Sequence, residues 1–71
     1  MTVCIESYKN NNFYVSLEIT NKYGNEVYIV QACQCIDNDR CGYPENEMVY
    51  PIKDKKKAYA TYRRYIKKYC E

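Results

Sequence analysis

The chain has 71 residues, of which 46% are hydrophobic and 28% charged, which excludes a disordered segment and is typical of one small folded domain. Such a domain has a core that outweighs the cost of ordering the chain by only about 3–5 kcal/mol. The net charge of +2 is unevenly divided: residues 1–52 carry three basic and seven acidic side chains, whereas residues 53–71 carry eight basic and two acidic. We therefore expect a single domain with an acidic part and a basic part.

Four β-strands are predicted before any helix. Their approximate ranges are 2–8, 13–20, 26–36 and 47–52, and apolar and polar side chains alternate along the first two. In the second strand the odd positions from Phe13 to Ile19 are apolar, so one face belongs to the core and the other contacts water. The third strand has apolar residues on both faces, which is typical of a central strand.

Turn-forming residues separate the predicted strands. Residues 9–12 form an asparagine-rich turn, and residues 21–25 form a hairpin loop in which Gly24 or an asparagine takes the left-handed conformation. Residues 37–46 have the turn formers and charges of a surface loop. Pro51 in the fourth strand indicates a sheet edge. These connections predict an α+β fold, an antiparallel meander with one helix packed across one face.

An amphipathic helix is predicted over residues 54–70, with Asp54 as its N-cap. At 100° per residue, its apolar side chains fall within about 140° of arc, the width of a stripe that faces a core. The stripe consists of Ala58, Tyr59, Tyr62, Tyr65, Ile66, Tyr69 and Cys70.

The rest of this helix is basic. The candidate residues for binding a partner or an anion are Lys55, Lys56, Lys57, Arg63, Arg64, Lys67 and Lys68. The three lysines at 55–57 occupy the first turn, where the helix macrodipole favours acidic residues and each cation costs about 0.3–1 kcal/mol. The arc also lacks the acidic residues that would form i, i+4 pairs. A solvated face is one interpretation, and a site for phosphate or for a partner's carboxylates is the other.

Tyrosines provide a second set of candidate interface residues. Tyr14 and Tyr28 are predicted on the sheet face opposite the helix, together with Val30, and Tyr59 and Tyr65 at the borders of the apolar stripe. An open face of this kind either stacks single-stranded bases or closes a homodimer. Both interpretations stay open on the sequence.

Catalytic and metal-binding chemistry has little support. The chain has no histidine, and its two glycines cannot build a glycine-rich phosphate loop, so we expect no enzyme and no cofactor. Cys33, Cys35 and Cys41 lack the two-residue spacing usual in zinc sites. Plain thiols, a zinc site and a reversible disulfide involving Cys41 or Cys70 are the alternatives for these cysteines.

The cysteine count also bears on location. Five cysteines are an odd number, and no signal peptide opens the chain, so reduced thiols in the cytoplasm are expected. No apolar run is long enough for a membrane span, so no membrane partner is expected.

One segment has a recognisable pattern. Residues Met48 to Cys70, MVYPIKDKKKAYATYRRYIKKYC, resemble the ends of small uncharacterised proteins of phages and mobile elements in Firmicutes. The resemblance implies a context in which small proteins inhibit host defence, anti-CRISPR proteins among them, or act as accessory nucleic-acid binders. Four strands followed by a helix also look like the element order of PC4-like single-strand binders.

The sequence thus predicts a small non-enzymatic binding protein. The leading hypothesis is an inhibitor-type protein that docks its basic helix arc on a host protein or nucleoprotein complex. The alternative is direct nucleic-acid binding, in which the same arc neutralises phosphates. The acidic character of residues 1–52 disfavours this alternative, because a dedicated binder of this size is normally more basic.

Overall fold

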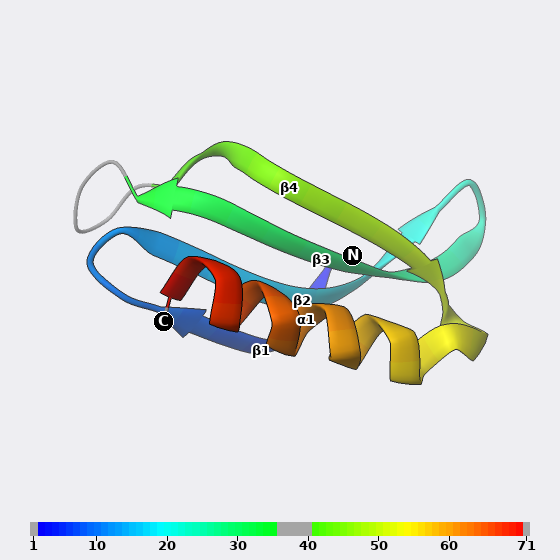
Figure 1. Cartoon of the computed structure of the whole chain (residues 1–71). Helices are drawn as coiled ribbons and strands as arrows, with labels where there is room; N and C mark the ends of the chain where they lie inside the picture. Colours follow the sequence, from blue (N-terminus) through cyan, green and yellow to red (C-terminus); the bar gives the residue numbers. More distant parts are fainter. Residues whose placement is uncertain (1, 36–40, 71) are drawn as a thin grey trace.

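The computed structural model describes residues 2–35 and 41–70. Figure 1 shows a four-stranded antiparallel sheet in the order β1-β2-β3-β4, with one helix across one face. The elements are β1 Val3–Lys9, β2 Phe13–Lys22, β3 Asn25–Cys35, β4 Cys41–Pro51, the 3₁₀ turn η1 Ile52–Asp54 and the helix α1 Lys55–Cys70. The predicted α+β meander with a C-terminal helix is therefore confirmed.

The alternation in β2 determines which face of the sheet is the core. Val15 and Leu17 are fully buried under α1, as their odd positions predict. Residues directly opposite each other in an antiparallel pair share a face. Leu17 pairs with Val30 and Val15 with Ala32, so the even positions of β3 join the same core.

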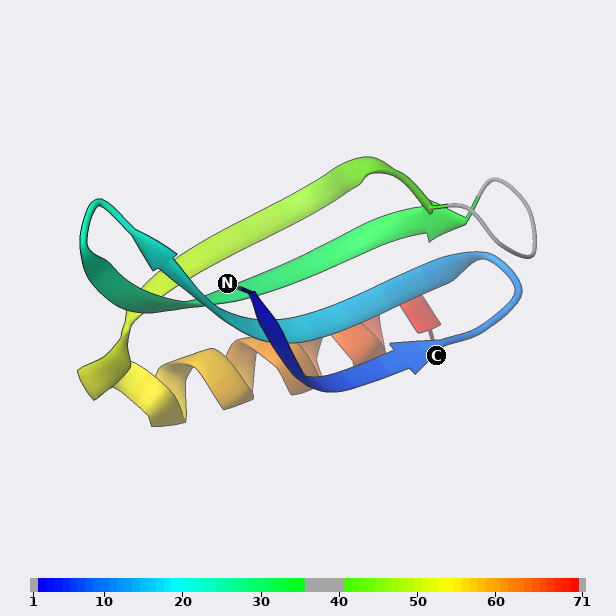
Figure 2. The ribbon, with the colours of Figure 1, turned by 180° about the vertical axis from the view of Figure 1, so that it is seen from behind.

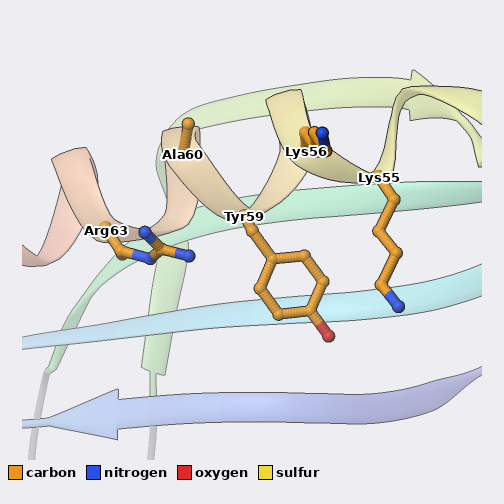
Figure 3. Close-up of a pocket in the computed structure, with 5 residues that line it drawn as sticks. All are labelled: Lys55, Lys56, Tyr59, Ala60 and Arg63. Carbon is orange, nitrogen blue, oxygen red and sulfur yellow. The ribbon is translucent and has the colours of Figure 1, made fainter.

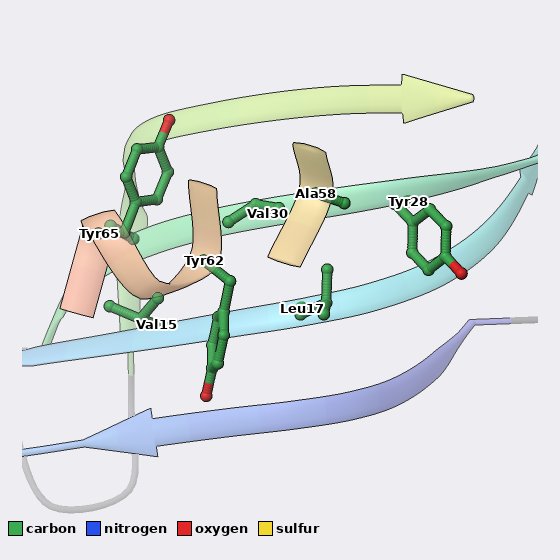
Figure 4. Close-up of a cluster of buried hydrophobic side chains, with 8 residues drawn as sticks. Val15, Leu17, Tyr28, Val30, Ala58, Tyr62 and Tyr65 are labelled. Atoms are coloured by element: carbon green, nitrogen blue, oxygen red, sulfur yellow. The ribbon is translucent and has the colours of Figure 1, made fainter. Parts of the chain in front are cut away.

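This register corrects the predicted placement of Tyr28 and Val30. Both were expected opposite the helix, but Tyr28 is only 6% exposed and Val30 is fully buried, and both lie in the core beneath α1 (Figure 4). Because β3 is apolar on both faces, its own pattern does not select one. Pairing with β2 selects it, since a one-residue slip would exchange the two faces.

β4 begins earlier than predicted. The sequence indicates a loop over 37–46, whereas β4 starts at Cys41; residues 36–40 lie outside the described range. Backbone pairing with β3 outweighs the local turn propensity of this stretch. Pro44 and Pro51 are tolerated because β4 is an edge strand, as Pro51 predicts.

The helix packs across β2, β3 and β4 (Figures 1 and 2). Ala58, Tyr62 and Tyr65 are its buried apolar residues, and the other members of the predicted stripe pack partly against the same core. Thr61 is buried too, which the apolar pattern misses. Its hydroxyl lies 2.6 Å from the hydroxyl of Tyr50 on β4, so a hydrogen bond satisfies both groups. In the described chain, no helix is long and apolar enough to cross a membrane.

The start of α1 differs from the prediction. Asp54 ends the 3₁₀ turn that precedes the helix, and its carboxylate caps no amide in the described chain. The first helical turn therefore contains the three lysines with no acidic residue to balance the macrodipole.

Side-chain hydrogen bonds hold the turn between β1 and β2. The Asn10 Oδ1 atom accepts from the backbone amides of Asn12 and Phe13 at 2.8 and 2.7 Å. The Asn10 Nδ2 atom donates to the carbonyl of Cys70 at 3.4 Å. One asparagine therefore shapes this turn and joins it to the end of α1.

The β2–β3 hairpin has a two-residue turn of Tyr23 and Gly24. Gly24 has a φ of 82°, as predicted, but Tyr23 also has a positive φ, of 54°. Positive φ at both positions is required by a type I′ turn, whose first position favours asparagine. A tyrosine there costs roughly 1–2 kcal/mol, and the ring, 93% exposed, gains little from packing within the chain.

We predict that Tyr23→Asn stabilises the protein. Asparagine tolerates the left-handed conformation, so the free energy of unfolding should rise by about 1 kcal/mol. Thermal denaturation should show a melting temperature about 4–8 °C higher. The control Tyr23→Phe keeps the backbone strain and should have the melting temperature of the wild type. Equal melting temperatures for all three proteins would show that Tyr23 is not strained.

A second prediction concerns the partly buried hydrogen bond between Tyr50 and Thr61. Tyr50→Phe removes one partner and should lower the free energy of unfolding by about 1 kcal/mol. The matched control is Tyr8→Phe, since Tyr8 is 46% exposed. Urea denaturation of the two variants measures the difference, and equal midpoints would show that the bond contributes nothing net.

Candidate functional site

The outer surface of α1 is basic, as predicted. We call the exposed residues Lys55, Lys56, Lys57, Arg63, Arg64, Lys67 and Lys68 the basic face. Six of them share the outer surface because the opposite side of the helix is held against the sheet, and the helical repeat turns their positions outward. Lys55 is exposed because it begins the helix, and its side chain extends to the same side as Tyr59 (Figure 3).

Contacts within the chain orient part of the basic face. The Lys55 Nζ atom lies 5.8 Å from the centre of the Tyr59 ring, close enough for a cation–π contact. The Lys68 Nζ atom lies 5.2 Å from the centre of the Tyr69 ring. These contacts limit side-chain motion without neutralising the charges.

The charge of the basic face is not compensated within the described chain. Among residues 2–35 and 41–70, no carboxylate forms an ion pair with any of its seven members. Lys56, Arg63 and Lys67 follow one another along the outside of the helix, where water reaches them. Their positive field is therefore directed outward, toward whatever binds there.

Two shallow hollows flank the basic face. The larger, of about 640 Å³, is lined by Lys55, Lys56, Tyr59, Ala60 and Arg63 (Figure 3). The smaller, of about 450 Å³, is lined by Tyr50, Lys57, Ala60, Thr61 and Arg64. Ala60 belongs to both, and its small side chain lets a partner approach the helix backbone between the cations.

Two of the four candidate tyrosines are corrected by their burial. Tyr28 is 6% exposed and Tyr65 is 5% exposed, so neither offers a ring to a partner. Tyr59 is half-buried and meets the Tyr28 ring edge-on at 6.5 Å while lining the larger hollow. Tyr65 and Tyr28 are buried because the apolar stripe of α1 lies against the sheet, so the rings of both residues are enclosed in the core between them.

The sheet face away from α1 is not a basic surface. Tyr14 lies on it, half-buried, and burial raises the pKa of Tyr14 while a hydrogen bond with Ser7 opposes the shift. Glu18 and Glu47 lie on the same face, and the Glu47 carboxylate accepts a hydrogen bond from Gln31 at 3.1 Å. Lys9 pairs with Tyr14 across β1 and shares this face, so its charges are mixed and do not form the basic groove that single-stranded nucleic acid binds. The homodimer predicted through it stays a prediction.

The cysteines do not gather into a site in the part of the chain that the structure describes. Cys4, Cys33, Cys35 and Cys70 are thiols, and no group of three or more potential metal ligands occurs there. The side chain of Cys41 lies outside the description. Cys4 is exposed and Cys33 is buried, so the thiols differ in their access to solvent.

Sequence reasoning missed two residues that the structure makes prominent. Ala60 is exposed in the middle of the basic face, and its position between two pairs of cations in the sequence could have identified it. Tyr23 is exposed at the β2–β3 hairpin tip, and the presence of an aromatic residue where the turn favours asparagine could have identified it.

In comparisons with known proteins, no family model, curated protein or solved structure matches this chain. The case for a function therefore depends on the residues and their geometry.

The buried tyrosines predict a loss of stability in alkali. Burial raises the pKa of Tyr62 and of Tyr65 above the ordinary value of 10.0. The folded state therefore keeps these protons when the unfolded state has lost them, and this contribution to stability falls as the pH rises above about 10. Melting temperatures measured from about pH 9 to about pH 11 should decrease.

A Tyr62→Phe/Tyr65→Phe variant isolates this contribution from the titration of lysines. Phenylalanine cannot ionise, so the melting temperature of the variant should fall less steeply over the same pH range. Parallel curves for variant and wild type would show that these two hydroxyls do not produce the alkaline loss.

Proposed function

We propose that this protein is a small non-enzymatic binding protein that docks its basic face on an acidic surface of a protein partner. The observation that carries this proposal is the set of seven exposed cations without ion pairs in the described chain, five of which line two hollows. A helix that served only solubility would normally intersperse acidic residues among them.

Such a surface suits recognition by charge and by shape. An uncompensated positive field steers an acidic partner into the encounter and limits the orientations in which it docks. The hollows beside Ala60 accept side chains that project from the partner. Arg63 beside Tyr59 is a pairing of residue types favoured at the centres of interfaces.

A protein partner is favoured over nucleic acid. Stacking of single-stranded bases needs exposed aromatic rings along a basic groove. Tyr28 and Tyr65 are buried, and Tyr14 lies on a face of mixed charge that carries Glu18 and Glu47 as well as Lys9. Cations alone bind phosphates, but without base stacking the affinity is low and decreases steeply as the salt concentration rises.

The biological role that we propose is that of an inhibitor. The resemblance of residues 48–70 to small phage and mobile-element proteins supports an anti-defence function, with a host protein or nucleoprotein complex as the target in the cytoplasm. Inhibition by occlusion needs no catalytic group, which agrees with a function based on docking alone.

The test compares two variants whose net charge falls by the same amount. Lys56→Gln/Arg63→Gln/Lys67→Gln neutralises the centre of the basic face, and Asn11→Asp/Asn12→Asp/Gln34→Glu adds charge at exposed positions away from α1. Affinity capture from a host lysate should lose its protein partner by on the order of tenfold or more with the first variant only. Nuclease treatment should leave the capture by wild type unchanged.

A plaque assay on a host with an active antiphage defence gives the functional readout. Wild type and the control variant should raise phage titre, and the neutralised variant should not. Capture that persists in the neutralised variant would refute docking through the basic face, and capture lost on nuclease treatment would make nucleic acid the ligand.

A further inference from the structure

Tyr23 is an exposed aromatic residue that neither conformation nor packing within the chain explains. Its ring is 93% exposed, at the tip of the β2–β3 hairpin, with a backbone φ of 54°. No hydrogen bond, ion pair or ring contact joins its side chain to another residue within 2–35 and 41–70. Asparagine would fit the turn with less strain, so the tyrosine has a local cost without an intramolecular return.

The hairpin tip lies at the same end of the molecule as the start of α1 (Figures 1 and 2). Val27 of β3 pairs with Pro51 of β4. The hairpin tip lies a few residues before Val27 along β3, and α1 begins a few residues after Pro51. From the rise per residue, the tip and the first helical turn are about 30 Å apart or less. That span fits within one ordinary protein interface of about 800 Å² per partner.

The surroundings of Tyr23 at this end are charged and partly apolar, and Asp54 ends η1 just before the lysines of α1. Lys22 precedes it in the hairpin, and Ile52 and Lys53 are exposed in η1, between β4 and α1. Glu26 is the acidic residue of the hairpin, three positions after Tyr23. One protruding aromatic ring and the first-turn lysines of the basic face thus lie at the same end of the molecule (Figures 1 and 2).

We propose that Tyr23 is an anchor residue that inserts into an apolar pocket of the same acidic protein on which the basic face docks; this inference rests on the proposed function. A tyrosine on a tight two-residue turn is held in place before binding, so little conformational entropy is lost when its ring is buried. Tyrosine is also among the residues most enriched at the energetic centres of interfaces.

The ligand that we propose is a folded protein with carboxylates beside an apolar pocket. The carboxylates are inferred from charge complementarity with the basic face, and the apolar pocket is inferred from the single projecting ring of Tyr23. A single-stranded nucleic acid is disfavoured, because it needs successive rings along a groove, whereas Tyr23 stands alone on a tip.

Photocrosslinking tests the inference with a nuclease-treated host lysate as the probe. Photoreactive benzoylphenylalanine replaces Tyr23, Ala60 in the basic face, or Asn11 in the turn at the other end of β2, in three separate proteins. The first two should crosslink to one and the same protein, identified by mass spectrometry, and the third should not.

The second measurement is the dependence of the Ala60 crosslink on the ring of Tyr23. Tyr23→Asn should lower its yield by on the order of tenfold or more, although the same substitution relieves backbone strain and stabilises the fold. Tyr23→Phe should retain most of the yield, because it keeps the ring. Loss of binding in the more stable variant cannot result from unfolding.

The outcomes separate this inference from the function on which it rests. A crosslink from Ala60 that is absent from Tyr23 and insensitive to Tyr23→Asn would overturn the anchor and leave docking through the basic face intact. Absence of crosslinks from both positions would overturn both proposals. Binding of labelled oligothymidylate at low salt that is lost in Tyr23→Asn would show that the ring serves nucleic acid and would also overturn the anchor.

Discussion

The contact on which the structure depends is the packing of one helix against one face of a four-stranded sheet. Tyr62 and Tyr65 of α1 extend over the sheet in opposite directions, and with Ala58 they form one buried core with Leu17 and Val30 (Figure 4). A domain of 71 residues has no second core to compensate for the loss of this contact. The orientation of the helix is therefore determined by its tyrosine side, and the cations on the other side are presented to solvent as a consequence.

This single contact also separates the charges of the molecule. Glu18 and Glu47 lie on the sheet face away from α1, which they share with Lys9, and the outer side of α1 carries the basic face. Because the helix lies between most of its cations and the sheet, the two sets of charges do not neutralise each other in the described chain. A molecule of this kind has an orientation in the field of an acidic partner before any contact forms.

Two exposed features run against local preference, and both lie at one end of the molecule. The first turn of α1 contains three lysines where the macrodipole disfavours them, and Tyr23 takes a backbone conformation that favours asparagine or glycine. Neither feature contributes to the core. Local costs that the fold does not need are best explained by an interaction outside the chain, and their proximity favours one partner for both.

The sequence by itself determined those elements whose apolar periodicity defines a single buried side. The odd positions of β2 and the tyrosine stripe of α1 each define one apolar side, so the meander, the helix and the exposure of its cations followed from periodicity. Only the tertiary structure decided which face of β3 is buried and how far β4 extends, because both depend on pairing with a neighbouring strand rather than on local propensity. It likewise decided that Tyr28 and Tyr65 are core residues and that Tyr23 projects, since the exposure of a tyrosine depends on what packs over its ring.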